Sequence, residues 1–314
     1  MEKKEEGLKT TNNMKVLVTG ATGFVGFALC KDLVERGYDV VGLAWGPESV
    51  LADLQGKENF AVERGDVRSA KEMRAIVAKH KPEAVFHTAA KLPAESDNPE
   101  DFFDVNVKGT FHVLEACREA NVNTVIHSSS MSVYGHAIEY LPVDEHHPTH
   151  PFDLYSLTKL QGEELCTLYA ENWHMNIVVL RYSGIYGARK TGGAVAAFFR
   201  NAREENPLEV RGETRWDLVS LGDVVKANVL ALRHIEKARG EVCNIGSGEE
   251  TSVKELAEAI KEITGSSSEI RTVSSSGESL RFVYDISKAR KALGYMPRSL
   301  REGLKEYYDE IQSV

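Results

Sequence analysis

Cysteine is scarce in this chain. Only four occur in 314 residues, at Cys30, Cys117, Cys166 and Cys243, and no two stand close enough in the sequence to suggest a zinc-binding pair. Four cysteines are also too few for a chain built like a small secreted domain, which disulfides hold together. The sequence therefore predicts reduced cysteines that act as small buried hydrophobic residues.

Long apolar runs and an excess of basic residues are also missing. No run approaches the roughly 20 apolar residues that span a bilayer, and the first 13 residues lack the apolar region of a signal peptide. The formal net charge of -9 disfavours nucleic acid or an anionic membrane as a partner, because a negative surface repels polyanions. We predict a cytoplasmic protein with no nucleic-acid or membrane partner, preceded by a disordered extension over residues 1–13.

Alternating short apolar runs and longer amphipathic stretches begin at Met14. This pattern is typical of β-α units on a parallel sheet. We predict an α/β fold with a doubly wound parallel (Rossmann) sheet, whose ligand crevice lies at the carboxyl ends of the strands. The expected strands are Lys15–Thr19, Asp39–Leu43, Phe60–Arg64, Ala84–Thr88, Thr124–Ser128 and Asn176–Arg181. The expected helices are Phe24–Arg36, Ala70–His80, Glu100–Asn121 and Tyr155–His174.

The pattern changes after Gly184. Shorter elements follow, and an apolar run at Val242–Ile245 returns the chain to the sheet. We expect a dinucleotide-binding domain over residues 14–183, to which residues 220–246 return. A smaller mixed C-terminal lobe for the substrate would contain residues 184–219 and 247–314.

A glycine-rich segment, Thr19-Gly20-Ala21-Thr22-Gly23-Phe24-Val25-Gly26, follows the first expected strand and opens the first helix. Glycines at this spacing let the backbone turn tightly, admit a pyrophosphate and let the helix pack on the strand. The helix amino terminus then offers N–H groups and a partial positive charge to the phosphates. We predict that this turn binds a dinucleotide. The contacting residues would be Gly20, Thr22, Gly23, Phe24, Val25 and Gly26.

The adenosine end of the cofactor is less well specified. An acidic residue roughly 20 positions after the turn favours NAD, and an arginine there favours NADP. Residues 42–46 read Gly-Leu-Ala-Trp-Gly and offer neither, so they leave the choice between NAD and NADP open. We expect NAD, with NADP not excluded. Asp66, after the third strand, is the candidate partner for the adenine.

A tyrosine and a lysine stand four residues apart in Tyr155-Ser156-Leu157-Thr158-Lys159. On a helix this spacing places both side chains on one face. The reference pKa of a tyrosine, about 10, is too high for a base at neutral pH, and a fixed cation beside the phenol favours its deprotonated form. The pair predicts a general base, Tyr155, that Lys159 activates. Lys159 can also donate to the ribose of the cofactor.

A serine run, His127-Ser128-Ser129-Ser130, ends a buried strand at the edge where α/β sheets place their chemistry. A serine hydroxyl there can donate to a substrate oxygen on which charge develops. Together with the glycine turn and the tyrosine-lysine pair, Ser130 predicts proton and hydride transfer at a carbinol carbon.

These motifs resemble the extended short-chain dehydrogenases/reductases, in particular the NAD-dependent sugar epimerases and dehydratases, which include UDP-glucose/UDP-galactose 4-epimerase. The resemblance runs from Met14 to Tyr307 and includes Asp104–Thr110 and Tyr284–Ala289. It implies that Ser130, Tyr155 and Lys159 are catalytic. Further residues that it implies for the cofactor are Asp66, Val67, Ala89, Ala90, Asn106, Ser128 and Tyr182, besides Tyr155 and Lys159.

The chain departs from that family at several positions. Met131 and Ser132 stand where the dehydratases carry an acid pair, which disfavours dehydration. Gly184 replaces an asparagine that meets the substrate in many members. The arginines that clamp a nucleotide diphosphate are displaced or absent, so Arg215, Arg281 and Arg189 are the substrate-binding candidates, besides Ser130 and Tyr155.

Three functions remain open at this point. A nucleotide-sugar 4-epimerase would pass through a transient keto sugar and keep its cofactor bound. A dehydrogenase or ketoreductase of a sugar, a sugar acid or another small hydroxy compound would use the same residues and exchange its cofactor. A non-catalytic dinucleotide sensor would usually have lost Tyr155 or Lys159.

Two further expectations concern metal and partners. The histidines of the loop at 144–151 are read as solvated, so we predict no metal site. The resemblance implies a homodimer in which Glu100–Asn121 and Tyr155–His174 form a four-helix interface.

Overall fold

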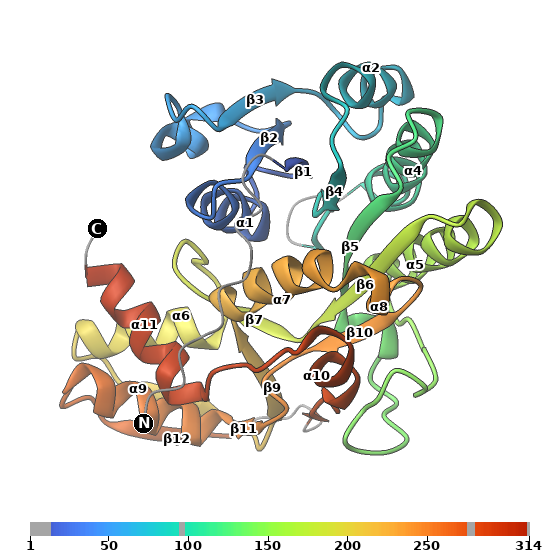
Figure 1. Ribbon diagram of the computed structural model, residues 1–314. Coiled ribbons are helices and arrows are strands. Elements are labelled where there is room, and N and C mark those ends of the chain that lie inside the picture. Colours follow the sequence, from blue (N-terminus) through green and yellow to red (C-terminus); the bar gives the residue numbers. More distant parts are fainter. Residues whose placement is uncertain (1–13, 94–97, 275–279, 313–314) are drawn as a thin grey trace, which may run out of the picture. The chain divides into compact units, whose positions relative to one another are not determined.

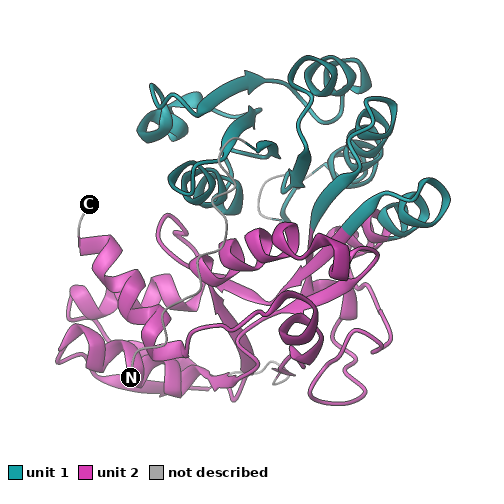
Figure 2. Cartoon of the chain, viewed as in Figure 1, with its two compact units in different colours: residues 1–127, 164–177 teal, residues 128–163, 178–314 magenta. Residues whose placement is uncertain are grey.

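A computed structural model describes residues 14–93, 98–274 and 280–312; the extension predicted at residues 1–13 lies outside them. The chain divides into two compact units, shown in Figure 2. Unit 1 contains residues up to His127 and Glu164–Ile177, and unit 2 contains Ser128–Glu163 and Val178 onward.

A parallel sheet of seven strands has the order β10-β6-β5-β4-β1-β2-β3 (Figure 1). The strands are β1 (Lys15–Thr19), β2 (Asp39–Ala44), β3 (Phe60–Arg64), β4 (Ala84–His87), β5 (Thr124–Ser130), β6 (Asn176–Tyr182) and β10 (Val242–Ile245). The predicted doubly wound α/β fold is therefore confirmed, and the run at Val242–Ile245 joins the sheet as expected. The strand β5 extends two residues beyond its predicted end, so Ser129 and Ser130 belong to it.

The strands of unit 1 alternate with helices because each apolar strand is followed by an amphipathic stretch. The helices α1 (Phe24–Glu35) and α2 (Ala70–His80) match the prediction closely, as does the start of α5 (Leu154–Trp173). A 3₁₀ segment, η1 (Glu48–Leu54), follows β2. In β1, Val16, Leu17 and Val18 are completely buried, each with 0% exposure.

The expected helix Glu100–Asn121 is divided into three parts. A short α3 (Glu100–Phe102) leads into a π-helical segment, η3 (Phe103–Gly109), and then into α4 (Thr110–Glu119). The Thr110 hydroxyl donates to the carbonyl of Asn106, one turn earlier, at 2.6 Å. The wider π-helical turn leaves the helical run from 100 to 119 unbroken, and hydrophobic periodicity does not reveal it.

Unit 2 adds smaller sheets to β6 and β10. The strands β11 (Glu250–Ser252), β9 (Arg215–Ser220) and β13 (Arg281–Phe282) form one, with β7 (Gly184–Tyr186) also paired to β9. The strands β8 (Leu208–Arg211) and β12 (Ile270–Val273) form another. Its remaining elements are η4 (Met131–Tyr134), α6 (Ala194–Arg203), α7 (Leu221–Arg233), α8 (Ile235–Ala238), α9 (Val253–Thr264), α10 (Ser287–Leu293) and α11 (Leu300–Gln312).

A second hydrophobic core lies within unit 2, among α6, α9, α11 and the strands β8 and β9. Phe199, Leu256 and Leu304 are almost completely buried in it. The start of α9 has a capping box, in which Ser252 accepts from the Glu255 N–H and the Glu255 carboxylate accepts from the Ser252 N–H. This core holds β9 and α6, which line the pocket described below.

Candidate functional site

The glycine-rich turn of unit 1 has the geometry that a dinucleotide requires. Gly20 has φ +70°, and a Cβ placed on it would come within 2.8 Å of the Ala89 backbone. Gly23 precedes α1 as its N-cap residue and makes no side-chain cap, so the N–H groups of the first turn are left for a ligand. A Cβ on Gly26 would lie 2.1 Å from the Gly20 carbonyl oxygen, so the helix can pack this closely only on a glycine. The residues present therefore fit a pyrophosphate.

A buried polar chain supports the turn from behind. The Thr19 hydroxyl contacts His87 Nδ1 at 2.8 Å, and His87 Nε2 contacts the Thr110 hydroxyl at 3.0 Å. The Thr88 hydroxyl donates to the Thr19 carbonyl at 2.7 Å, and the Ala89 N–H donates to the Thr19 hydroxyl at 3.3 Å. These bonds fix the end of β4 against the end of β1, which brings Ala89 beside the glycine turn. Ala90 follows it, half-buried.

Asn106 is buried, and its side-chain amide binds the backbone of Lys91. Its Oδ1 accepts from the Lys91 N–H at 2.7 Å, and its Nδ2 donates to the Lys91 carbonyl at 3.2 Å. Asn106 thus orders the segment that follows β4. The side chain of Val67, another predicted cofactor residue, is buried, and a Cβ on Gly109 would lie 2.8 Å from it.

Two residues that the sequence analysis did not identify, Trp45 and Arg68, lie beside Asp66. The guanidinium of Arg68 lies over the ring of Trp45 at 5.5 Å, and its Nε donates to Asp66 Oδ2 at 2.8 Å. Burial alone would raise the pKa of the Asp66 carboxyl, but hydrogen bonds from Arg68 hold that pKa below its usual value. Trp45 is 67% exposed. Arg68, which comes from the loop after β3, therefore lies beside the end of β2. The search for an acid or an arginine at the end of β2 in the sequence could not find it.

The predicted catalytic residues lie in unit 2. Asp153 caps the start of α5, since its Oδ1 accepts from the Ser156 N–H at 2.7 Å. Tyr155 is half-buried in the first turn, and Lys159 lies one turn further at 3% exposure. The Lys159 ammonium donates to the Ser128 carbonyl at 2.5 Å. The structure thus brings α5 and the end of β5 together.

The hydroxyls at the end of β5 have different partners. Ser130 is half-buried, and its Oγ accepts from both the N–H and the hydroxyl of Ser132, at 3.2 and 3.0 Å. The Ser128 hydroxyl contacts the Tyr182 hydroxyl at 3.0 Å. Burial raises the pKa of Tyr182 to about 12, which makes this phenol unsuitable as a base. Burial likewise raises the pKa of Tyr134 to about 12.

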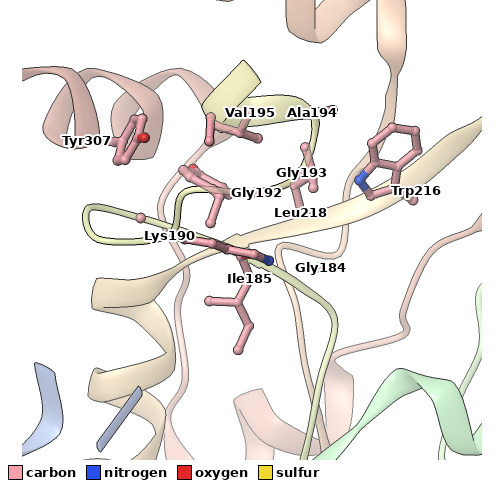
Figure 3. Close-up of a pocket in the computed structure, with 13 residues that line it drawn as sticks. Gly184, Ile185, Lys190, Gly192, Gly193, Ala194, Val195, Trp216, Leu218 and Tyr307 are labelled. Carbon is pink, nitrogen blue, oxygen red and sulfur yellow. The ribbon is translucent and has the colours of Figure 1, made fainter. Parts of the chain in front are cut away.

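A pocket of about 220 Å³ lies within unit 2 (Figure 3). The loop after β7, the start of α6 and the strand β9 line it, and Figure 3 shows Trp216 and Tyr307 on opposite sides. Trp216 and Leu218 line the pocket from β9. Because alternate side chains of a strand face opposite sides, Arg215 turns away from Trp216 and binds Glu255 at 3.4 Å.

The other two substrate-binding candidates are also on the surface. Arg281 is paired with Glu250, its Nε donating to Oε1 at 2.5 Å. Arg189 is exposed and has φ +72°, an unusual conformation for a residue with a side chain. The structure therefore places none of Arg189, Arg215 and Arg281 among the residues that line the pocket, whereas Lys190 does line it.

Comparison with known proteins identifies the family. A model of the NAD dependent epimerase/dehydratase family matches residues 16–246. The chain is 35% identical over 301 residues to a putative UDP-glucose 4-epimerase of Methanocaldococcus jannaschii, a match that covers 92% of this chain and 96% of the relative. The chain belongs to the NAD-dependent epimerase/dehydratase family.

Other members of the family agree in sequence and in fold. UDP-glucose 4-epimerase of Mycolicibacterium smegmatis is 33% identical, over 93% of this chain and 96% of that protein. The crystal structure of UDP-glucose 4-epimerase from Thermotoga maritima with UDP-glucose superposes with a TM-score of 0.84 at 31% identity, covering 95% of this chain and 100% of that one. UDP-glucuronic acid 4-epimerase from Bacillus cereus, in complex with NAD, gives 0.83 at 31% identity, covering 96% and 99%.

The family assignment confirms the resemblance that the motifs indicated, and with it the prediction of an NAD-dependent enzyme of the extended short-chain dehydrogenase/reductase type. Among the residues that the structure describes, no three or more histidine, cysteine, aspartate or glutamate side chains lie together in a way that could hold a metal ion. None of its described helices is both long and apolar enough to cross a membrane.

Proposed function

We propose that this chain is a nucleotide-sugar 4-epimerase that interconverts UDP-linked hexoses differing at C4. The observation that supports the proposal is the hydrogen bond from Lys159, the proposed base-activating cation, to the Ser128 carbonyl near the end of β5. The relatives named as UDP-glucose 4-epimerases support the substrate class. The roles of individual residues below are part of the proposal.

The chain's own residues would move the proton. Tyr155 accepts the proton of the C4 hydroxyl, and the adjacent Lys159 ammonium stabilises the phenolate that makes this possible. Ser130 donates a hydrogen bond to the same oxygen as it becomes a carbonyl. When bound, NAD would supply a reversible acceptor for the C4 hydride, which lets the configuration at C4 be inverted. Substrate and product are at the same oxidation level, so no external oxidant is needed.

The turn over residues 19–26 would hold the pyrophosphate of the cofactor, and Asp66 would meet the adenine. We propose NAD in preference to NADP, because two structural neighbours are NAD complexes. The pairing of Arg68 with Asp66 is consistent with this choice, since the carboxylate neutralises the guanidinium that a 2′-phosphate would need. The predicted division into a dinucleotide-binding domain and a substrate lobe remains part of the proposal.

A second function has one observation in its favour. Trp216, an aromatic side chain, lines the pocket of unit 2, while Arg215 and Arg281 are engaged by glutamates. A site without an arginine clamp suits a substrate that lacks a diphosphate. The alternative is therefore a dehydrogenase or ketoreductase of a free sugar, a sugar acid or another small hydroxy compound.

The content of bound dinucleotide separates the two functions. We expect the purified protein, once denatured, to release a stoichiometric amount of NAD, and the native protein to interconvert UDP-glucose and UDP-galactose without net reduction of added cofactor. An epimerase recycles its cofactor and can retain it through many turnovers. Protein that contains no dinucleotide, and that reduces added NAD or NADP with free sugars or sugar acids, would instead establish the dehydrogenase.

We also propose a homodimer, formed through α4 and α5. Large apolar side chains remain exposed on both helices of the described chain: Phe111 at 42%, Leu168 at 46% and Trp173 at 44%. We expect Leu168→Glu to convert the dimer into a monomer, because a charge in the centre of an apolar interface loses its hydration without gaining a partner. Analytical ultracentrifugation of the wild type and the variant measures this; a monomeric wild type would contradict it.

The cytoplasm is the proposed location. All four cysteines are free and buried, as expected of a protein in a reducing compartment.

A further inference from the structure

Glu163 lies on α5 one helical turn beyond Lys159. Tyr155, Lys159 and Glu163 follow each other at intervals of four, so they share one face of the helix. Glu163 is 4% exposed, and Lys159 is 3% exposed. A carboxylate at this depth is tolerated only where other groups replace its hydration. The hydrogen-bond partners of Glu163 therefore show which strands hold this face of α5.

Arg181 of β6 is the main partner of Glu163. Its Nη2 donates to Glu163 Oε2 at 2.6 Å, and its Nε donates to Oε1 at 3.0 Å, the two-pronged geometry in which a guanidinium holds a carboxylate most firmly. Arg181 Nη1 donates to the Tyr134 hydroxyl at 2.7 Å, and the guanidinium lies 4.8 Å from the centre of that ring. The Tyr134 hydroxyl donates in turn to Asn244 Oδ1 at 2.8 Å. The carboxylate is thus held in place from β6.

Ser129 of β5 completes the arrangement, because its hydroxyl donates to Glu163 Oε1. Ser129 stands between Ser128, whose carbonyl accepts from Lys159, and Ser130, the proposed donor to the substrate. Since side chains alternate along a strand, Ser129 faces away from Ser128 and Ser130. Adjacent residues of β5 are therefore joined to α5 at two points, one through Lys159 and the other through Glu163.

We propose that Glu163 is a positioning residue for the reaction: held by Arg181, it fixes α5 against the end of β5 and so sets where Tyr155 and Lys159 stand relative to Ser130. The inference rests on the catalytic roles proposed above. The opposite charges of Glu163 and Arg181 offset each other, so the pair orients Lys159 without adding a net charge beside it. Glu163 contacts Ser129 and Arg181, and it acts on the substrate indirectly, through the placement of Tyr155 and Lys159.

Steady-state kinetics on the intact enzyme test this role. We expect Glu163→Gln and Ser129→Ala to lower kcat by about tenfold or more, because small displacements of reacting groups are costly in rate. The KM for the UDP-sugar and the content of bound dinucleotide should stay as in the wild type. Glu164→Gln, the same change at the exposed neighbour on α5, should leave both parameters unchanged.

A double variant separates positioning from simple stabilisation. Glu163→Leu combined with Arg181→Met removes both charges and fills the space with apolar groups, a replacement that buried ion pairs often tolerate. We expect kcat to stay low even where this variant melts at the wild-type temperature. Recovery of the wild-type kcat, or a fall in kcat that only follows loss of the dinucleotide, would overturn the proposal.

The rate at which an amine reagent labels Lys159, followed by peptide mass spectrometry, needs no substrate. It should rise several-fold in Glu163→Gln, in Ser129→Ala and in the double variant, and should match the wild type in Glu164→Gln. If the wild type does not act on UDP-sugars, the proposed function fails while this measurement still decides the role of Glu163. Equal labelling rates in all variants would refute it.

Discussion

Replacement of Tyr155 by phenylalanine is expected to lower the turnover of a UDP-sugar by at least about a hundredfold, the usual contribution of a positioned acid-base group. The change removes one oxygen from a half-buried side chain in the first turn of α5 and leaves the helix cap at Asp153 intact. The fold and the dinucleotide content should therefore be retained. Single-turnover and steady-state assays, with the released dinucleotide measured in parallel, check both parts.

Tyr140→Phe is the matched control, since its hydroxyl binds Asp144 on the surface at 2.8 Å and the side chain is 43% exposed. We expect wild-type turnover from this variant. Undiminished turnover in Tyr155→Phe would show that another group takes the proton. The described phenols Tyr134 and Tyr182 are poor substitutes, because burial raises the pKa of each to about 12.

Gly26→Ala should have the second large effect, on stability and on cofactor binding together. The added Cβ would lie 2.1 Å from the Gly20 carbonyl oxygen and 2.8 Å from the Thr88 hydroxyl, so α1 must move away from the turn. Overpacking of this kind, against backbone, costs about 3 kcal/mol or more. We expect a fall in melting temperature of roughly 5–10 °C and protein that purifies without its dinucleotide.

Gly192→Ala supplies the comparison. A Cβ at that position meets no atom within 4 Å, and its φ lies outside the left-handed region. Its melting temperature should therefore stay within about 2 °C of the wild type. A Gly26→Ala protein with wild-type stability and bound dinucleotide would mean that the turn relaxes without cost, and that close packing of α1 is not what the glycine provides.

Short stretches of contiguous sequence were sufficient to predict the elements that carry the motifs. The glycine spacing of residues 20–26 predicted the turn, and the four-residue interval from Tyr155 to Lys159 predicted a shared helix face; both depend only on local backbone geometry. The apolar run at Val242–Ile245 predicted its place in the sheet for a similar reason, since a buried strand needs a short apolar segment. The predicted helix near 100–121 is present as a continuous helical run over 100–119, but periodicity did not reveal its π-helical turn at 103–109.

The substrate-binding arginines show where local reasoning ends. The resemblance to the family made Arg215 a substrate-binding candidate, although the arginines of the diphosphate clamp are displaced or absent in this chain. The direction of Arg215 depends on the register of β9 with β11 and β13, strands that are distant in the sequence, and that register turns Trp216 into the pocket and Arg215 toward Glu255. A shift of one residue along a strand reverses the face of every side chain, and no local pattern fixes it here.

The sequence by itself determined the fold class, the family and the three residues proposed for catalysis, because these depend on periodicity and on spacings within single elements. Only the tertiary structure decided which side chains from separate elements meet. Arg68 reaches Trp45 from another loop, and Arg181 reaches Glu163 from another strand. The buried pair of Glu163 and Arg181 is selected by strand register and by the cost of leaving a buried charge without a partner, and both arise only once the chain has folded.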